Sequence, residues 1–251
     1  TRLVKAMKQG DWKHVRSLQR LLTHSTAAKL LAVRQVTSNR GKRTPGVDGV
    51  VWNTPQAKYA AAESLTPKDY TSKPLRRVFI PKVGGKYRPL GIPTMFDRAM
   101  QALYKLALDP LAENLADRNS YGFRKYRSVA DAIAQCFIIL CHKSSAEYIL
   151  EADIAGCFDG ISHIWLREHI PTDTQVLQEW LEAGVIHDGV FQDTTEGPPQ
   201  GGIVSVTLCN MTLDGIERLL ETYCLSRGKS YRQRYKIHFV RYADDFIITS
   251  S

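Results

Sequence analysis

Hydrophobic residues recur at two different spacings along this chain, and each spacing predicts a different kind of element. Near the start the spacing is helical, about 3.6 residues, and predicts helices from about Asp11 to Leu22 and from Ser25 to Ser38. Asp11 and Ser25 belong to the residue types that cap helix N-termini. One side of the first helix is apolar and carries Trp12, Val15, Leu18 and Leu22.

Three later segments are predicted to be strands, one from period-two alternation and two from aromatic and β-branched content. Residues 75–92 predict two strands joined through Gly84-Gly85, which is a hairpin. Residues 148–154 predict a strand whose even-numbered residues face a buried side, with Asp153 on the opposite side. Residues 236–249 predict two strands on either side of a turn that contains Asp244.

Helices are predicted between these strands. Asp97 is expected to cap a long helix that reaches toward Ala116 and bends at Pro110. After residue 204 we expect one amphipathic helix, whose apolar face carries Leu208, Met211, Leu219, Leu220 and Tyr223.

Composition narrows the class of protein. The chain has 251 residues, a net charge of +9 and a pI near 9.3, which favours a polyanionic partner such as a nucleic acid. Five cysteines without a Cys-x-x-Cys pair indicate a reducing compartment, either a bacterial cytoplasm or an organelle, and argue against a disulfide scaffold or a zinc site. The longest apolar run, residues 136–141, is too short to span a bilayer, so no membrane partner is expected.

Three carboxylates stand at predicted strand ends. Asp244 and Asp245 lie in the turn of the last hairpin, and Asp153 lies at the end of the strand at 148–154. Two ionised groups about 4 Å apart repel by roughly 4 kcal/mol at an effective dielectric of about 20. Adjacent carboxylates therefore favour a divalent cation or a basic partner, although an Asp pair can also be simple turn chemistry. With Asp153 added, the set can hold two metal ions for in-line phosphoryl displacement.

The segments around these carboxylates resemble a known family. Asp153-Ile-Ala-Gly-Cys-Phe-Asp159 and Tyr242-Ala-Asp-Asp245 are similar to two palm motifs of reverse transcriptases, specifically those encoded by group II introns. Pro199-Gln-Gly-Gly-Ile-Val-Ser205 is similar to the family's Pro-Gln-Gly-Gly motif, and residues 80–93 resemble its fingers hairpin. Residues 44–49 and 121–133 match two further blocks, so the resemblance covers nearly the whole chain.

The resemblance implies an α+β fold, the right hand of polymerases, with fingers, a palm built on an antiparallel sheet and a helical N-terminal extension. We expect the RNA-binding extension at residues 1–45, the fingers with the fingers–palm helices at 46–145, and the palm at 146–251. Relatives continue into a thumb, which is absent here. Because the chain runs from Thr1 to Ser251 and stops after the last predicted strand, we expect a fragment that folds but polymerises weakly or not at all.

The resemblance also implies roles for individual residues. Asp153, Asp244 and Asp245 would be catalytic and, with the Ile154 carbonyl, would hold two Mg²⁺ ions, for which Mn²⁺ could substitute. The incoming dNTP would contact Lys82, Arg88, Phe158, Gln200 and Gly201, and the ring of Phe158 would exclude a 2′-hydroxyl. RNA would contact Lys13, Arg16, Arg20, Arg76 and Arg77, for which a solvated surface is the alternative interpretation.

The predicted function is an RNA-directed DNA polymerase encoded by a group II intron, a nucleotidyltransferase that also acts as a maturase in splicing and retrohoming. The expected partners are group II intron RNA, an RNA template with a DNA primer, and dNTPs; whether the chain forms a homodimer is left open. The alternatives are a splicing-only maturase, a viral-type RNA-dependent RNA polymerase and a palm-type nucleotide cyclase. Phe158 disfavours the RNA polymerase, and the fingers hairpin disfavours the cyclase.

Overall fold

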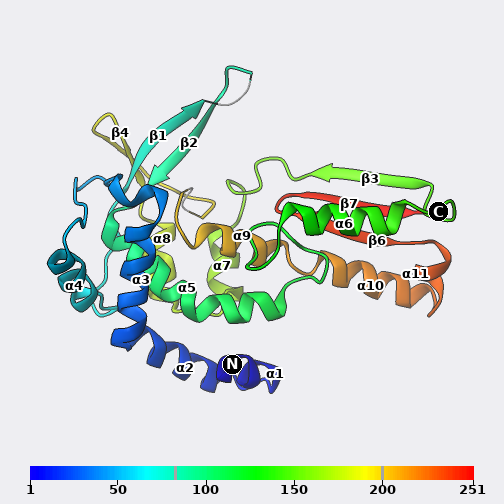
Figure 1. Ribbon diagram of the computed structural model, residues 1–251, viewed down its shortest axis with the longest axis horizontal. Helices are drawn as coiled ribbons and strands as arrows, with labels where there is room; N and C mark the ends of the chain where they lie inside the picture. Colours follow the sequence, from blue (N-terminus) through cyan, green and yellow to red (C-terminus); the bar gives the residue numbers. More distant parts are fainter. Residues whose placement is uncertain (82–83, 199–200) are drawn as a thin grey trace. The chain divides into compact units, whose positions relative to one another are not determined.

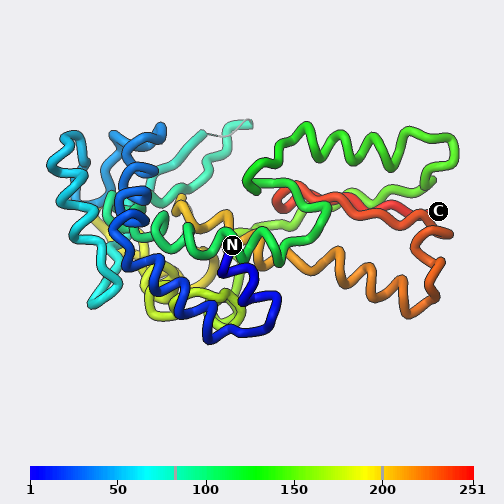
Figure 2. The backbone as a smooth tube through the Cα atoms, turned by 60° about the horizontal axis from the view of Figure 1, so that its bottom comes forward, coloured from blue at the N-terminus to red at the C-terminus, as the bar shows by residue number. Residues whose placement is uncertain are grey.

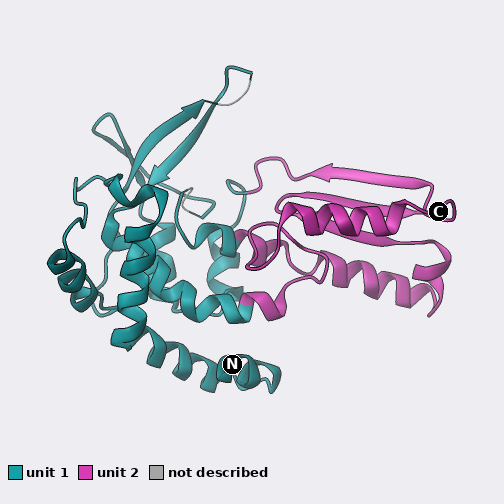
Figure 3. Cartoon of the chain, in the orientation of Figure 1, with its two compact units in different colours: residues 1–111, 158–208 teal, residues 112–157, 209–251 magenta. Residues whose placement is uncertain are grey.

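The structure is a computed structural model that describes residues 1–81, 84–198 and 201–251. Its elements form two compact units, which are coloured separately in Figure 3. Unit 1 comprises residues 1–111 and 158–208, and unit 2 comprises residues 112–157 and 209–251. The predicted domain boundaries at residues 45 and 145 do not coincide with these units, and that three-part division stays a prediction.

Unit 1 begins with a series of helices. These are α1 (Arg2–Lys8), α2 (Trp12–His24), α3 (Thr26–Ser38), the 3₁₀ turn η1 (Arg40–Arg43) and α4 (Pro55–Ser64), with α7 (His163–His169) and α8 (Thr174–Leu181) later in the chain (Figure 1). The two predicted N-terminal helices are confirmed as α2 and α3, whereas α1 was not predicted. The Asp11 carboxylate caps α2 by accepting a hydrogen bond from the His14 amide at 2.9 Å, but the Ser25 side chain makes no such bond to α3.

The core of unit 1 is centred on α5 (Met95–Leu115), a helix that extends into unit 2. Its part in unit 1 buries Met95, Ala99, Met100, Ala102, Leu103, Ala107, Leu108 and Leu111. Thr94 caps this helix, since its hydroxyl accepts from the Asp97 amide at 3.1 Å and donates to the Asp97 carboxylate at 2.6 Å. The prediction that Asp97 is the cap is wrong, because Asp97 occupies the third helical position of a reciprocal capping arrangement.

Unit 1 also contains a four-stranded sheet with the order β2-β1-β4-β5. Strands β1 (Leu75–Pro81) and β2 (Tyr87–Ile92) pair antiparallel, which confirms the predicted hairpin. Strands β4 (Val185–His187) and β5 (Val190–Gln192) were not predicted, and β4 pairs parallel to β1. Asp188 and Gly189 form the turn between them, with φ of 47° and 79°.

Unit 2 is built on a three-stranded antiparallel sheet with the order β3-β7-β6. Its strands are β3 (Tyr148–Asp153), β6 (His238–Tyr242) and β7 (Asp245–Ser250). Its helices include α10 (Ile216–Arg227) and α11 (Tyr231–Arg234). Helix α6 (Val129–Leu140) lies along this sheet (Figures 1 and 2), with Ala132 and Ile139 packed against Val240 and Tyr121. The predicted hairpin around Asp244 and the antiparallel sheet are confirmed.

Two expectations about unit 2 are wrong. The face of β3 that was expected to be buried is open, with Tyr148 68% and Leu150 57% exposed, because β3 is an edge strand and α6 packs against β6. The single amphipathic helix after residue 204 is two helices, α9 (Ser205–Leu213) and α10, separated by Gly215 at φ 116°. Leu219 is consequently 70% exposed and does not share a buried face with Leu208.

Asp117 stabilises this break in the helix. One oxygen of its carboxylate accepts hydrogen bonds from the amides of Gly215 at 2.9 Å and Glu217 at 3.1 Å, so it satisfies the free N–H groups at the start of α10. No helix in the described ranges combines the length and the apolar character needed to cross a membrane.

Candidate active site and nucleic-acid interface

The three carboxylates singled out in the sequence lie at one end of the unit 2 sheet. Ala243 and Asp244 form the turn between β6 and β7, and Ala243 adopts a left-handed conformation at φ 59°. Asp245 begins β7 and is paired across the sheet with Asp153, the last residue of β3. The register of β3 on β7 therefore brings the three carboxylates together from two distant segments.

Electrostatics at this sheet end are unfavourable without a cation. Burial, followed by the charges of Asp153, Asp244 and Glu151, raises the pKa of Asp245 above its usual range, because nearby negative charges disfavour ionisation. In the described ranges, no three His, Cys, Asp or Glu side chains are grouped closely enough to form a ready metal site. The donor chemistry nevertheless fits Mg²⁺, which prefers carboxylate oxygens, and repulsion opposes the closer approach of these side chains.

Unit 1 carries the residues predicted to bind the nucleotide. Arg88 is exposed on β2, whereas Lys82 and Gln200 lie outside the described residues. Gly201 has a φ of 104°, and a Cβ atom there would come within 2.3 Å of the Gly91 carbonyl oxygen. The backbone at Gly201 therefore passes directly against β2, at a distance that only glycine permits.

Phe158 is half-buried in unit 1, and a second glycine loop packs on its backbone. A Cβ atom on Gly197, whose φ is 77°, would come within 2.3 Å of the Phe158 carbonyl oxygen. The imidazole of His163 lies 2.8 Å from the Gly197 carbonyl oxygen, which ties the same loop to the start of α7. The backbone of Phe158 is thus held on one side by residues distant in the sequence.

Comparison with known proteins decides the family. Residues 80–251 match the reverse transcriptases, described as RNA-dependent DNA polymerases, and residues 1–65 match the N-terminal domain of reverse transcriptase. This chain belongs to the reverse transcriptases. Members of the family generally use divalent metal ions.

Individual relatives place this reverse transcriptase with the intron-encoded kind. It is 34% identical to Escherichia coli protein YkfC (92% of this chain, 70% of YkfC), and 32% identical to the group II intron-encoded protein LtrA of Lactococcus lactis (76% and 33%). It is also 32% identical to the maturase-like protein 1 of Euglena gracilis (97% and 52%). The predicted membership of the group II intron reverse transcriptases and maturases is confirmed, and the chain spans only part of each relative's length.

The solved structures agree on the fold. A chain of the partial Cas6-RT-Cas1–Cas2 complex matches with a TM-score of 0.50 at 18% identity, over 93% of this chain and 38% of that one. At this identity the likeness concerns the fold alone. Together with the family match, it confirms the predicted polymerase right-hand fold of mixed helices and sheet.

The β6–β7 turn of this reverse transcriptase is stabilised by Arg241, a residue that was not predicted from the sequence to have a role. Arg241 is fully buried, and its Nη1 donates to the Ala243 carbonyl at 2.9 Å and to the Asn210 side chain at 3.2 Å. Its Nη2 donates to the Asp214 carboxylate at 2.6 Å. Burial lowers the pKa of Arg241 and raises that of Asp214, and their mutual attraction opposes both shifts. The guanidinium thereby fixes the backbone that carries Asp244.

Gly122 supports the same turn. A Cβ atom at this position would lie 2.3 Å from the Ala243 amide nitrogen, so the 121–122 backbone passes directly against the turn. The Asn210 side-chain amide donates to the Gly122 carbonyl at 2.8 Å. The Tyr121-Gly-Phe block, which the sequence marked only through its resemblance, has this packing role in the fold.

Two of the cations predicted to contact RNA line a shared hollow in unit 1. Arg16 and Arg20 of α2 line a pocket of about 370 Å³ together with His24 and Lys68. Asp173 also lines it, but its carboxylate accepts hydrogen bonds from the first turn of α8. The pocket is therefore suited to a phosphate group.

The other three cations predicted to contact RNA do not line this pocket. Lys13 is exposed on α2 and is not among the residues that line the pocket. The Arg76 guanidinium donates two hydrogen bonds, of 3.1 and 2.9 Å, to the Pro45 carbonyl and so anchors the 44–49 loop. Arg77 is half-buried on β1. Contacts of these three cations to RNA stay predictions.

Positive charge is concentrated at the N-terminus. Residues 1–65 contain twelve Lys and Arg against three Asp and Glu, which leaves +9. Residues 66–251 contain 22 of each and are neutral overall, so the net charge of the chain resides in the part that matches the N-terminal domain of reverse transcriptase. Such a localised excess is typical of a surface for a polyanion.

Proposed function

We propose that this chain supplies the catalytic part of an RNA-directed DNA polymerase and, at its N-terminus, the RNA-binding surface of an intron maturase. The register of β3 on β7 carries the proposal, because it brings Asp153 and Asp245 opposite each other beside Asp244. The proposed partners are group II intron RNA, an RNA template annealed to a DNA primer, and dNTPs. Membership of the reverse transcriptases supports RNA as the template.

Asp153 and Asp244, with the Ile154 carbonyl, would hold two Mg²⁺ ions, and Asp245 would orient or complete the site; Mn²⁺ could substitute. Bound at these residues, the ions would supply activation of the primer 3′-hydroxyl and stabilisation of the leaving pyrophosphate. The contribution of the protein is to fix the ligands: the strand pairing sets Asp153 against Asp245, and Arg241 fixes the turn that carries Asp244. Precise positioning matters because a small misplacement can cost about 100-fold in rate.

Unit 1 would bind the incoming nucleotide. Arg88 offers a planar guanidinium and Lys82 a point charge to the triphosphate. The segment with Gln200 and Gly201 would lie against the incoming nucleotide and the template base, and Phe158 would occupy the space that a 2′-hydroxyl needs.

Primer extension tests the proposal. The full-length protein is given a DNA primer on an RNA template, Mg²⁺ and either dNTPs or rNTPs. We expect templated DNA product with dNTPs and little product with rNTPs. Extension with rNTPs at the same efficiency would favour an RNA polymerase. RNA binding without any extension would favour a splicing-only maturase, the alternative supported by the basic N-terminus.

Phe158→Val should relax the choice of sugar. Removing the ring makes room for a 2′-hydroxyl, so the kcat/KM for rNTPs should rise while that for dNTPs falls because contact with the sugar is lost. Single-nucleotide incorporation with matched dNTP and rNTP measures both. Selectivity unchanged from wild type would show that the ring does not face the sugar.

Arg16→Gln and Arg20→Gln should weaken binding of structured RNA. Each phosphate contact removed lowers the slope of log affinity against log salt by about one unit, so the double variant should lose about two. Filter binding across a salt series measures the slope. Lys143→Gln is the control, since it removes one exposed charge in unit 2. An unchanged slope in the double variant would mean that Arg16 and Arg20 face solvent and contact no phosphate of the RNA.

A further inference from the structure

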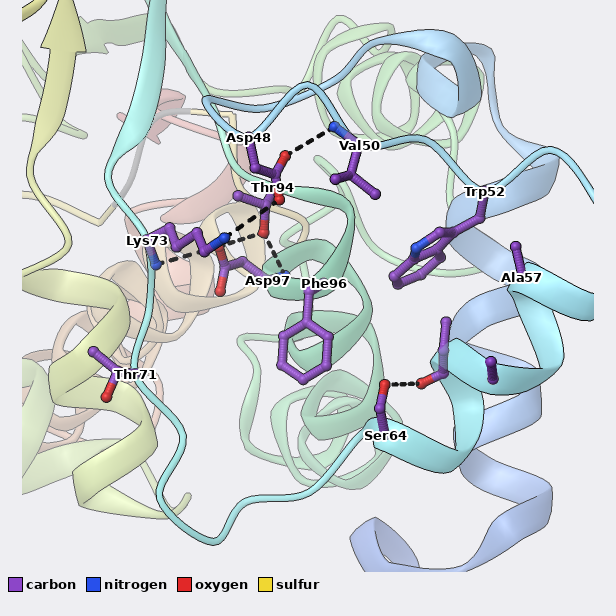
Figure 4. A pocket seen from close by; sticks show the side chains of 12 residues that line it. Asp48, Val50, Trp52, Ala57, Ser64, Thr71, Lys73, Thr94, Phe96 and Asp97 are labelled. Carbon is purple, nitrogen blue, oxygen red and sulfur yellow. Dashed lines mark hydrogen bonds and ion pairs between the residues drawn. The ribbon is translucent and has the colours of Figure 1, made fainter.

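A pocket of about 510 Å³ lies in unit 1 between α4, the loop that precedes it and the start of α5 (Figure 4). Its walls are mainly apolar and consist of Val50, Trp52, Ala57, Ala60, Ala61 and Phe96. Figure 4 shows the rings of Trp52 and Phe96 both reaching into this space. Pockets of this size and character typically take a small flat ligand or one group of a larger one.

Polar groups gather at one side of the pocket. The Asp48 carboxylate accepts from the Val50 amide at 3.1 Å, and its second oxygen lies 3.8 Å from the Lys73 ammonium. This ion pair is long, and the Lys73 side chain is 60% exposed. Asp48 and Lys73 can therefore accept and donate further hydrogen bonds. Asp97, by contrast, is buried and already bonded to Tyr70 at 2.7 Å and to Thr94.

A second pocket, of about 430 Å³, shares Trp52 with the first and therefore adjoins it. Its lining is polar and includes Lys42, Arg43 and Lys58. Across the described ranges, no carboxylate lies within ion-pair distance of these three cations. An aromatic pocket thus stands beside a group of uncompensated positive charges.

We infer that the two pockets together bind one unpaired nucleotide of single-stranded RNA. The base enters the first pocket against Trp52 and Phe96, with its polar edge toward Asp48 and Lys73. The phosphate lies in the second pocket against Lys42, Arg43 and Lys58. Unpaired RNA bases are commonly bound by stacking on aromatic rings beside a cationic track. A base in a duplex is stacked between its neighbours and cannot enter, so the site is selective for unpaired RNA.

This inference deepens the RNA binding of the proposed function and rests on it. The occupant follows from charge complementarity, since residues 1–65 carry the whole net charge of +9. An acidic peptide could neutralise the same cations. An acidic peptide would not, however, explain why two aromatic rings line the neighbouring pocket, or why the Asp48 carboxylate can accept hydrogen bonds there.

Two substitutions of Trp52 test the inference. Trp52→Leu removes the ring but keeps apolar volume, and Trp52→Phe keeps an aromatic face. Loss of one stacked base should weaken binding of a fluorescein-labelled oligouridine about tenfold in Trp52→Leu, with little change in Trp52→Phe. Because no phosphate contact is lost, the salt slope should stay as in wild type. Affinity for a blunt-ended, fully paired RNA duplex should not change in either variant.

The cations provide a separate test that leaves the apolar pocket intact. Replacing Lys42, Arg43 and Lys58 together by Gln should lower the salt slope for oligouridine by about one unit, because the single phosphate contact of the site is lost. An oligouridine carrying one 2-aminopurine tests insertion on the wild-type protein. Stacking of this base on an aromatic ring should quench its fluorescence, and Trp52→Leu should abolish the quenching.

Several results would overturn the inference. These are wild-type affinity in Trp52→Leu, an equal loss of affinity for the blunt-ended duplex, or the absence of quenching in wild type. Primer extension run in parallel separates this site from the polymerase. If RNA binding depends on Trp52 but no primer is extended, the polymerase proposal is refuted and the nucleotide site stands. If primers are extended but RNA binding does not depend on Trp52, the nucleotide site is refuted and the polymerase proposal stands.

Discussion

Asp244→Asn should lower the rate of primer extension by at least about 1,000-fold and leave RNA affinity unchanged. Asn keeps the shape of the side chain but removes the charge that balances a divalent cation, and loss of one preorganised electrostatic contact at a reacting centre commonly costs this much. Single-turnover extension on an RNA template, with RNA binding measured separately, gives both quantities. Undiminished extension would contradict the assignment.

Measuring the stability of Asp244→Asn distinguishes a loss of catalysis from misfolding. After burial, the charges of Asp153 and Asp244 contribute to the raised pKa of Asp245, so removing the Asp244 charge should not lower the unfolding temperature measured without Mg²⁺. The matched control is Glu151→Gln, which removes a carboxylate from the same strand, two residues before Asp153. It should retain most of the activity.

Arg241→Met should lower the free energy of unfolding by about 3–5 kcal/mol, because it leaves the Asp214 carboxylate buried without its partner. It also removes the donor to the Ala243 carbonyl, so the turn that carries Asp244 loses its support and activity should fall with stability. Urea unfolding followed by circular dichroism measures the change.

Arg218→Met is the control for this prediction, since Arg218 is an exposed cation on α10 in the same unit. It should change the free energy of unfolding by less than about 0.5 kcal/mol. If Arg241→Met proved equally mild, the buried pair would contribute nothing to the fold and the turn would be held by its strands alone.

The local parts of the site could be predicted from the sequence. The β6–β7 hairpin joins strands that are adjacent in the chain, so the strand-forming residues and the turn between them are enough to place Asp244 and Asp245. The pairing of Asp153 with Asp245 joins distant segments. The sequence can put Asp153 at a strand end, but it cannot set the register, and only the resemblance indicated that Asp153 lies opposite Asp245.

Two elements were missed although the sequence carried a signal. Asp188-Gly189 between Val185-Ile-His187 and Val190-Phe-Gln192 is a two-residue hairpin turn of the type that Asp-Gly favours. Gly215 interrupts a helical pattern, and its positive φ ends the expected amphipathic helix there.

Other features depend on tertiary contacts, which leave no periodic pattern in the sequence. Arg241 follows two buried apolar residues on β6 and is itself buried, so alternation does not distinguish it. Its role exists only because Asp214 and Asn210 are brought to it by the fold. The pocket around Trp52 is likewise formed by a loop and two helices whose meeting no local pattern predicts.

The ends of β3 and of the β6–β7 hairpin are proposed to form one divalent-metal site. Fe²⁺ in place of Mg²⁺, with ascorbate and peroxide, generates hydroxyl radicals that cleave the backbone beside the bound ion. We expect cuts near residues 153–154 and 243–245 together, suppressed by excess Mg²⁺ and lost in Asp244→Asn. Cuts at only one of these segments, or cuts that persist in Asp244→Asn, would contradict it.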